Sequence, residues 1–364
     1  MKLNLPHLTP MHHYRGVALI TVMLVVALAA TIATQMLGRL QFQVQRTTNI
    51  SLNQQAYWYA MGAEALAKRV LFTTFKDEPE ITHLDQLWAQ GETSYPVEYG
   101  TITGEIIDLQ ACFNLNALRS KGKDDDTVSK GISSGDDASK KEISPSTEDT
   151  STGTEKNNLS ARDTLARLIV ALDLEGVNDF SAESMVDALT DWLDEDDAIV
   201  SPSGAEDNDY AAREFPYLTA NNYLASINEL RIIEHFTLPV INALKEYACV
   251  LPSDNLFKIN VNTLTTEKAK LLQAILDISS GDAEQILSAR DAKGFKNIEE
   301  FFSLPEVSNL QLNNGQKEYF VVDSEYFTLK ASTEFNQSYF FLNSILAVDD
   351  SNNITVISRK IGRY

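Results

Sequence analysis

The sequence predicts an α+β protein: a long N-terminal helix, a small antiparallel sheet, and a large all-helical domain inserted between the strands of that sheet. Three observations support this fold class. An uncharged apolar run near the N-terminus continues, without a proline, into a stretch of helical periodicity. Strand-like residues occur at 97–112 and alternation returns after residue 317. Most of the chain between those two stretches follows the helical repeat instead.

The N-terminal helix is predicted over residues 17–72. Residues 17–37 carry no charge and, at about 1.5 Å per residue, are enough to cross a bilayer once. Residues 38–71 contain no proline, and apolar residues recur there at helical spacing. We therefore expect the first half of the helix to lie in lipid and the second half to pack on a soluble domain. Lys2 and Arg15 precede the apolar run, which places the N-terminus in the cytoplasm.

Three interpretations of this segment compete. It could be a secretory signal peptide cut near the ALA sequence at 27–29, an uncleaved signal anchor, or a prepilin-type segment. Gly16 lies directly before the apolar run, and an ordinary signal peptide does not need a glycine there. A signal peptide is also not followed by a continuing helix. Both features favour the prepilin-type segment.

The first strand-like residues lie around Ile102 and at 106–107. Residues 119–160 contain almost no large apolar side chain, so we expect a disordered loop that cannot offset its ordering entropy. Helical patterns follow at 161–250, and a helix, turn and helix at 263–304. The C-terminal strands are expected at 326–331, 340–348 and 354–357, with a hairpin turn at 349–353.

The chain has a formal net charge of −21, and no Asp or Glu occurs before Glu64. A negative surface of this size argues against general nucleic-acid binding and suits the recruitment of divalent cations. The sequence holds only two cysteines and five histidines, without a CxxC or HExxH motif. The sequence therefore lacks the Cys and His ligand patterns that a zinc site needs. No GxSxG motif occurs either, and we expect no catalytic activity.

An acidic cluster at 191–209 is the candidate metal site. Calcium takes about six to eight oxygen ligands, mostly carboxylates and carbonyls in a flexible loop. The sequence is not an EF-hand, but Trp192 and Tyr210 bracket the cluster and would hold it against the core. The alternative is a solvated acidic loop. The candidate calcium ligands are Asp194, Asp196, Glu206 and Asp209, with Asp191 as a further candidate.

Two other features have competing interpretations. Residues 260–301 look like a helix-hairpin-helix repeat, which in some proteins holds phosphate on a glycine-rich hairpin. Here the hairpin at 277–282 carries two aspartates and one glycine, so a structural module is the better interpretation. Cys112 and Cys249 lie beside apolar runs at the borders of the helical block. Outside the cytoplasm they could form a disulfide, and buried free thiols are the alternative.

Several segments resemble a known family. The sequence RGVALIT at 15–21 resembles the cleavage region of type IV prepilins and type II secretion pseudopilins. The segments QQAYWYAMGAE at 54–64 and FNLNAL at 113–118 are similar to the minor pseudopilin K family of type II secretion (GspK). The acidic cluster resembles the calcium-binding segment of that family. The resemblance covers nearly the whole chain apart from 119–160. Most pilins carry Glu where this chain has Thr21, and K-type members characteristically lack it.

The resemblance implies a structural subunit at the tip of the secretion pseudopilus. Its single membrane span would lie in the inner membrane, with the soluble domain in the periplasm. The prepilin peptidase would cut between Gly16 and Val17 and methylate the new N-terminus. Implied partners are the I-, J- and H-type minor pseudopilins and the major pseudopilin, with calcium as a structural cofactor. Two rivals remain: a single-span periplasmic nucleic-acid-binding protein that uses the 260–304 hairpin, and a secreted calcium-dependent enzyme.

The predicted domain organisation follows from the patterns and the resemblance together. The inserted domain is expected to contain helix-hairpin-helix or SAM-like modules, and the sheet to be pilin-like. The predicted boundaries are a leader at 1–16, the helix at 17–72, the first part of the pilin-like domain at 73–116, the helical insert at 117–315 and the C-terminal strands at 316–364.

Overall fold

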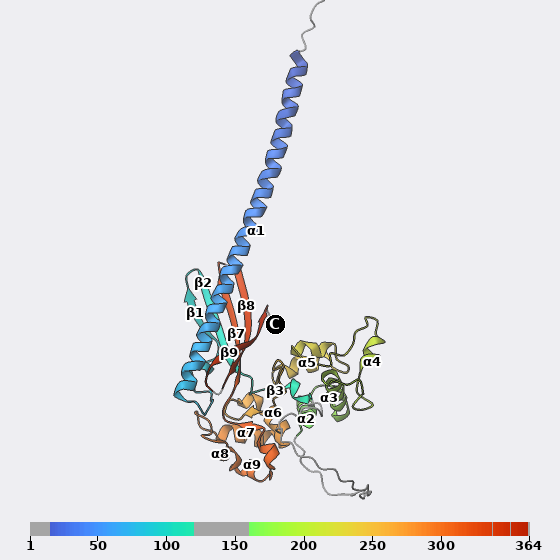
Figure 1. Ribbon diagram of the computed structural model, residues 1–364, viewed down its shortest axis with the longest axis vertical. Helices are drawn as coiled ribbons and strands as arrows, with labels where there is room; N and C mark the ends of the chain where they lie inside the picture. The colour runs from blue at the N-terminus through green and yellow to red at the C-terminus, as the bar shows by residue number, and fades with distance from the viewer. Residues whose placement is uncertain (1–14, 120–159, 337, 350, 363–364) are drawn as a thin grey trace, which may run out of the picture.

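The computed structural model describes residues 15–119, 160–336, 338–349 and 351–362. Helix α1 (Arg15–Asp77) extends far beyond the rest of the molecule, and only its C-terminal part lies against the sheet (Figure 1). The helical insert lies at the lower end of the sheet and to its right in this view. The mixed helix-and-sheet fold class is confirmed.

Helix α1 is 63 residues long, and its two halves differ in environment. In the first half the apolar side chains are exposed, and an 18-residue window there has a mean hydropathy of 2.6, high enough to cross a membrane. In the second half, small side chains face the sheet and let the helix approach it closely. The small buried residues are Ala56, Ala60, Ala63 and Ala67, and the larger Leu71 and Phe75 continue the same buried face.

Five antiparallel strands form the sheet, in the order β1-β2-β7-β8-β9. Their bounds are β1 Thr93–Val97, β2 Gly100–Asp108, β7 Tyr326–Phe335, β8 Ser338–Val348 and β9 Ile354–Ile361. Strand β2 pairs with β7 although the whole helical insert separates them along the chain. On β7 every second side chain, such as Phe327 and Leu329, is buried against α1, as a one-sided sheet requires.

The insert is built from short helices around one core. Its first part holds η2 Leu115–Leu118, α2 Ala161–Ala171, α3 Asp179–Leu193, α4 Asp207–Ala211, η4 Ile227–Arg231 and α5 Leu238–Leu244. Its second part holds η5 Thr266–Lys268, α6 Ala269–Leu276, α7 Ser280–Ala289, α8 Ile298–Phe302, α9 Pro305–Ser308 and α10 Asn314–Lys317. Two parallel ladders join distant segments: β3 (Phe113–Asn114) with β4 (Ala248–Cys249), and β5 (Ile259–Asn260) with β6 (Phe320–Val321).

The sheet and the insert meet at a buried polar junction. Asp108, at the end of β2, accepts hydrogen bonds from the hydroxyls of Thr263 and Ser324 at 2.5 and 2.6 Å. It also accepts the backbone N–H of Gln110 at 2.7 Å. Burial raises the pKa of Asp108, and these donors oppose that effect. Three distant parts of the chain therefore converge on one carboxylate.

The structure refines several sequence-based expectations. The first helix ends at Asp77 rather than at 72, and the strand expected over 97–112 covers only Gly100–Asp108. Strand β1 was not predicted, because Pro96 disfavours a strand except at a sheet edge, which is where β1 lies. The leader up to residue 14 and nearly all of the expected disordered loop, residues 120–159, lie outside the described residues.

Candidate functional site

The expected cleavage site lies in the first turn of α1. Val17 is exposed, and a Cβ added at Gly16 would meet no atom within 4 Å. The hydroxyl of Thr21 donates to the carbonyl oxygen of Ala18 at 2.9 Å. Thr21 is therefore satisfied within its own helix and needs no partner from another chain.

Asp191 organises the acidic loop that follows α3. This helix is started by a capping box between Asn178 and Ser181 and ends at Leu193. One carboxylate oxygen of Asp191 accepts the N–H of Val200 and the other accepts the N–H of Ala205, both at 2.9 Å. The side chain is fully buried. Of the candidate metal ligands, Asp191 is the one whose two carboxylate oxygens both hold backbone N–H groups of the loop.

Asp194 and Glu206 are the two buried carboxylates of the cluster that each have an oxygen without a hydrogen-bond partner. Their side chains are buried, and the structure gives no hydrogen-bond partner to Oδ1 of Asp194 or Oε1 of Glu206. Burial, reinforced by neighbouring carboxylates, raises the pKa of Asp194 to about 6 and that of Glu206 to about 7. A cation bound there would relieve both the lost solvation and the mutual repulsion.

The other two candidates lie at the surface and serve local roles. Asp196 is exposed and accepts the N–H of Ala198 at 2.9 Å. Asp209 is also exposed and accepts the N–H of Glu206 at 3.0 Å, at the start of α4. Within the described residues, no three His, Cys, Asp or Glu side chains are grouped as a ready-made metal cluster. Any cation bound here must draw further ligands from neutral oxygens, which calcium accepts.

Asn221 is a candidate ligand that the sequence analysis missed. Its backbone lies in the left-handed region at φ 44°, and its side-chain Oδ1 is buried without a hydrogen-bond partner. Its amide nitrogen lies 3.4 Å from Oδ1 of Asp197. The available signal was the pair Asn221 and Asn222, because asparagine tolerates the left-handed region better than most residues. The unpartnered oxygens of Asp194, Glu206 and Asn221 are of the type that a hard divalent cation such as calcium prefers.

The cysteines and the helix-hairpin-helix segment have structural roles. Cys112 and Cys249 are joined by a disulfide with a Cα–Cα distance of 5.8 Å. The turn between α6 and α7 contains Asp277 at φ 53°, and the hydroxyl of Ser279 accepts the N–H of Asp282 at 3.1 Å. The chain itself therefore caps α7, and two carboxylates surround the turn. This arrangement disfavours an anion such as phosphate.

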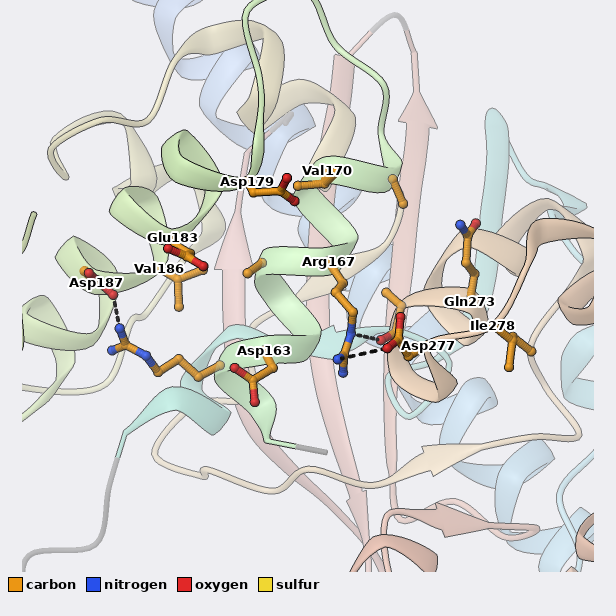
Figure 2. A pocket seen from close by; sticks show the side chains of 14 residues that line it. Asp163, Arg167, Val170, Asp179, Glu183, Val186, Asp187, Gln273, Asp277 and Ile278 are labelled. Carbon is orange, nitrogen blue, oxygen red and sulfur yellow. Dashed lines mark hydrogen bonds and ion pairs between the residues drawn. The ribbon is translucent and has the colours of Figure 1, made fainter. Parts of the chain in front are cut away.

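A groove between α2, α3 and α6 is lined by acidic residues and two arginines (Figure 2). Arg162 pairs with Asp187 on α3, and Arg167 donates to the carbonyl oxygen of Ala274 at 2.8 Å. Both guanidinium groups thus tie helices together. We assign the groove no chemistry of its own.

Comparison with known proteins identifies relatives along the whole chain. Two family models described as type II secretion system (T2SS), protein K, match residues 111–253 and 259–323. Protein K of Aeromonas hydrophila is 36% identical over 350 residues, which cover 95% of this chain and 97% of the relative. Protein K of Klebsiella pneumoniae is 32% identical over 355 residues, which cover 97% and 98%.

A solved structure shares the fold. It is the crystal structure of the GspK-GspI-GspJ complex from the enterotoxigenic Escherichia coli type 2 secretion system. The matching chain has a TM-score of 0.69 and 29% identity, and the match covers 88% of this chain and 100% of that one.

Proposed function

The chain belongs to the protein K family of type II secretion systems, and we propose that it is a membrane-anchored minor pseudopilin placed at the tip of the pseudopilus. The observation that carries this proposal is α1, one unbroken helix that passes from an exposed apolar segment into the core beside the sheet. A helix of this kind serves as membrane anchor and assembly element at once. The relatives are structural components of secretion, and we assign this chain no catalysis.

The anchor lies in the inner membrane, with the soluble domain in the periplasm. Lys2 and Arg15 flank the span on the cytoplasmic side, in keeping with the positive-inside rule. The prepilin peptidase removes the leader between Gly16 and Val17, and the new N-terminus is methylated. The open surroundings of Gly16 support this assignment, since a Cβ added there would meet no atom within 4 Å and Val17 is exposed.

The tip position follows from two features. Thr21 is satisfied within α1, whereas a buried glutamate in its place would need a partner from a subunit above. The helical insert also widens the molecule well beyond α1 and the sheet (Figure 1), which hinders close stacking around a thin filament. The partners are then minor pseudopilins of the I, J and H types, with the major pseudopilin below.

Mass spectrometry of the mature N-terminus tests the processing step. We expect a chain that begins with methylated Val17, and replacing Gly16 with a bulky residue should leave precursor in the membrane. A mature chain that starts near Ala30 would mean that an ordinary signal peptide had been removed. Co-purification with soluble I- and J-type minor pseudopilins tests the partners, and a failure to form any discrete complex would count against the tip assignment.

The acidic loop holds a structural calcium ion in this proposal. Asp194, Glu206 and Asn221 supply ligands whose oxygens otherwise lack hydrogen-bond partners. The exposed Asp196 and Asp209 are within the same loop region and can contribute further carboxylate oxygens, while Asp191 keeps its anchoring role. Bound calcium supplies positive charge that stabilises these buried carboxylates in their ionised form.

Thermal melting with calcium and with chelator tests this site. Because only the folded chain binds the ion, stability should rise by about 2.7 kcal/mol at a hundredfold excess over Kd. Asp194→Asn combined with Glu206→Gln should abolish the calcium-dependent gain. Equal melting curves in calcium and chelator, with no binding heat by calorimetry, would show that the acidic loop binds no calcium.

A further inference from the structure

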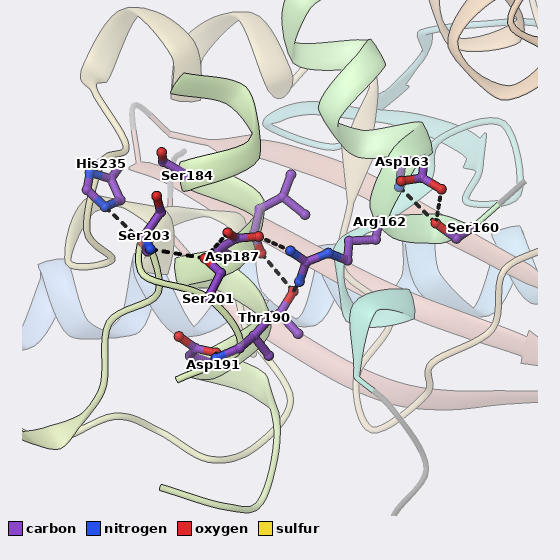
Figure 3. A network of polar contacts seen from close by, with 12 residues as sticks. Ser160, Arg162, Asp163, Ser184, Asp187, Thr190, Asp191, Ser201, Ser203 and His235 are labelled. Atoms are coloured by element: carbon purple, nitrogen blue, oxygen red, sulfur yellow. Dashed lines mark hydrogen bonds and ion pairs between the residues drawn. The ribbon is translucent and has the colours of Figure 1, made fainter. Parts of the chain in front are cut away.

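The loop that leads to Glu206 is held against α3 by a polar network centred on Asp187, which is not a candidate ligand (Figure 3). Asp187 is buried, and its two carboxylate oxygens face different elements. One accepts from Arg162 at the start of α2, and the other accepts from the hydroxyl of Ser201. A single carboxylate thus connects two helices and the loop.

Ser201, which is hydrogen-bonded to Asp187, also hydrogen-bonds to the backbone of the loop. Its hydroxyl oxygen accepts the N–H of Ser203 at 3.0 Å, and its carbonyl oxygen accepts the N–H of Gly204 at 2.9 Å. His235 lies 3.1 Å from the carbonyl oxygen of Ser203 on the opposite side of the loop. Residues 201–204 are therefore held at both their side-chain and their backbone atoms.

Asp187 and Asp191 both accept hydrogen bonds from residues 200–205 of the loop. They are four residues apart on α3 and so lie on one face of the helix. Asp187 holds Ser201, and Asp191 holds the N–H groups of Val200 and Ala205. Glu206 follows directly after this fastened stretch, whereas Asp194 follows directly after α3. The path of residues 200–205 therefore decides where Glu206 lies relative to Asp194.

We propose that Asp187 is a positioning residue that, through Ser201 and with Arg162 as its counter-ion, holds the 200–206 loop so that Glu206 faces Asp194. The part of this inference that concerns calcium rests on the proposed cation site. Asp187 is not among the candidate ligands, and each of its carboxylate oxygens accepts a hydrogen bond from the chain. Its role resembles that of residues that do not bind a metal themselves but hydrogen-bond to the groups that carry the ligands and so orient them.

The first variant is Ser201→Ala in the full chain in detergent. It removes the hydroxyl between Asp187 and the loop and leaves the pair of Asp187 with Arg162 intact. We expect calcium affinity by calorimetry to fall roughly tenfold, the usual scale for loss of such a support. Ser201→Thr keeps the hydroxyl and should restore affinity to within about twofold of the wild type. Glu183→Gln is the matched control: Glu183 is an exposed carboxylate one turn before Asp187, and among the described residues no hydrogen bond joins it to the loop, so affinity should be unchanged.

A second measurement needs no metal. In chelator, hydrogen exchange at the N–H groups of 200–206 should be faster in Ser201→Ala and in Asp187→Asn than in the wild type or in Glu183→Gln. The core of α3 should exchange at the wild-type rate in Ser201→Ala. This readout separates positioning of the loop from general loss of stability.

The outcomes distinguish the two proposals. If the wild type binds no calcium, the cation site fails, and hydrogen exchange still decides whether Asp187 holds the loop. If the wild type binds calcium and Ser201→Ala binds it equally well, Asp187 does not position Glu206. Unchanged exchange of the loop in both variants overturns the inference whatever the metal does.

Discussion

Gly204 shows how closely the acidic loop is drawn onto α3. A Cβ added at this position would lie 2.0 Å from Oδ2 of Asp191 and 3.1 Å from the carbonyl oxygen of Ser201. Both neighbours are held by hydrogen bonds of their own, so neither can retreat without cost. The glycine is required here for close approach, and its backbone is not in the left-handed region.

Gly204→Ala should therefore destabilise the protein by about 1–3 kcal/mol, the cost of leaving a buried carboxylate without its donors. Denaturant unfolding measures the change. Gly281→Ala is the matched control, because the nearest atom to its added Cβ is the hydroxyl of Ser279 at 3.8 Å. The control should be neutral or slightly stabilising, since alanine favours the helical backbone of α7. Equal effects of the two substitutions would contradict the close packing at Gly204.

Glu64 predicts how stability depends on pH. This buried residue of α1 accepts hydrogen bonds from Arg359 Nε at 2.7 Å, Arg359 Nη2 at 2.8 Å and the hydroxyl of Ser344 at 2.6 Å. The bonds from Arg359 hold the pKa of Glu64 below its usual value of 4.5. The stability that ionised Glu64 contributes through these bonds is therefore fully present above its usual pKa of 4.5. It is lost as the pH falls from about 4.5 through the lower pKa of Glu64 in the folded state.

Denaturant unfolding of wild type and Glu64→Gln between pH 7 and pH 3 checks this. The wild type should be the more stable at pH 7, and the difference should shrink as the pH falls through the window just described. The exposed Glu80→Gln is the control and should show no such pH-dependent difference. A difference between wild type and Glu64→Gln that stays constant down to pH 3 would disprove the role of the ion pair.

Sequence reasoning at this scale identified the acidic cluster but could not separate its members by role. Asp191 and Asp194 are three residues apart and look alike in sequence, yet one binds loop N–H groups and the other has an oxygen without a partner. Asn221 was missed because its burial depends on the path of a turn. Roles of this kind follow from tertiary geometry, which local pattern does not specify.

Among the elements, α1 was the most predictable. Its apolar run, its helical repeat and its lack of proline all agree, and the helix differs from the predicted 17–72 only by two further residues at the N-terminal end and five at the C-terminal end. The short helices α8, α9 and α10 could not be separated from turns, because four or five residues carry too little periodicity. Strand β1 depends on pairing with β2, a tertiary contact, and its proline argued against it.

The disulfide at the border of the helical insert gives a prediction for a pair of elements. Cys112 and Cys249 enclose a long stretch of chain, with a sequence separation of 137. Replacing both with serine should destabilise the protein by about 2–4 kcal/mol, because a long loop in the unfolded chain is released. Unfolding by denaturant with and without reductant measures this, and reductant should affect only the wild type.

The buried junction at Asp108 should keep the sheet and the insert together in that variant, since its hydrogen bonds do not involve the cysteines. Small-angle scattering of the double-serine variant should therefore match the wild type in native buffer. An expanded particle would show that the disulfide, rather than the polar junction, fixes the two parts. Asp108→Ala provides the comparison, because it leaves two buried hydroxyl donors without their acceptor.

On the scale of the whole molecule, the tip assignment makes a prediction about Thr21. Thr21→Glu would place a carboxylate in the apolar part of α1, where it needs a partner from a subunit above. If the wild type caps the filament, the variant should lower secretion or allow the chain to be built into internal positions. Secretion assays and immunogold labelling of pseudopili measure both. Thr34→Ser, which keeps a hydroxyl on the same helix, is the control. Unchanged assembly and secretion in Thr21→Glu would show that the missing charge is incidental.

The general architecture was accessible from sequence because strand-like residues reappear after a long helical stretch, which indicates an insertion. The register that pairs β2 with β7 was not accessible, since it joins residues such as Glu105 and Lys330 across the whole insert. The orientation of the insert relative to the sheet could not be predicted from the sequence either. That orientation depends on Asp108 and its donors from 263 and 324, which only the folded chain brings together.

Helix α1 also fixes the distance between its apolar span and the soluble domain. Residues 38–51 lie between the apolar span and Leu52, where α1 first packs against the core beside the sheet, and at about 1.5 Å per residue they amount to a stand-off of roughly 21 Å. The soluble domain is thus held at a set height above the lipid surface, with no loop that could shorten it. A partner anchored in the same membrane can meet this domain only if its own stalk has a matching length. Under the proposed anchoring, the length of this stalk therefore restricts which membrane-anchored partners can reach the domain.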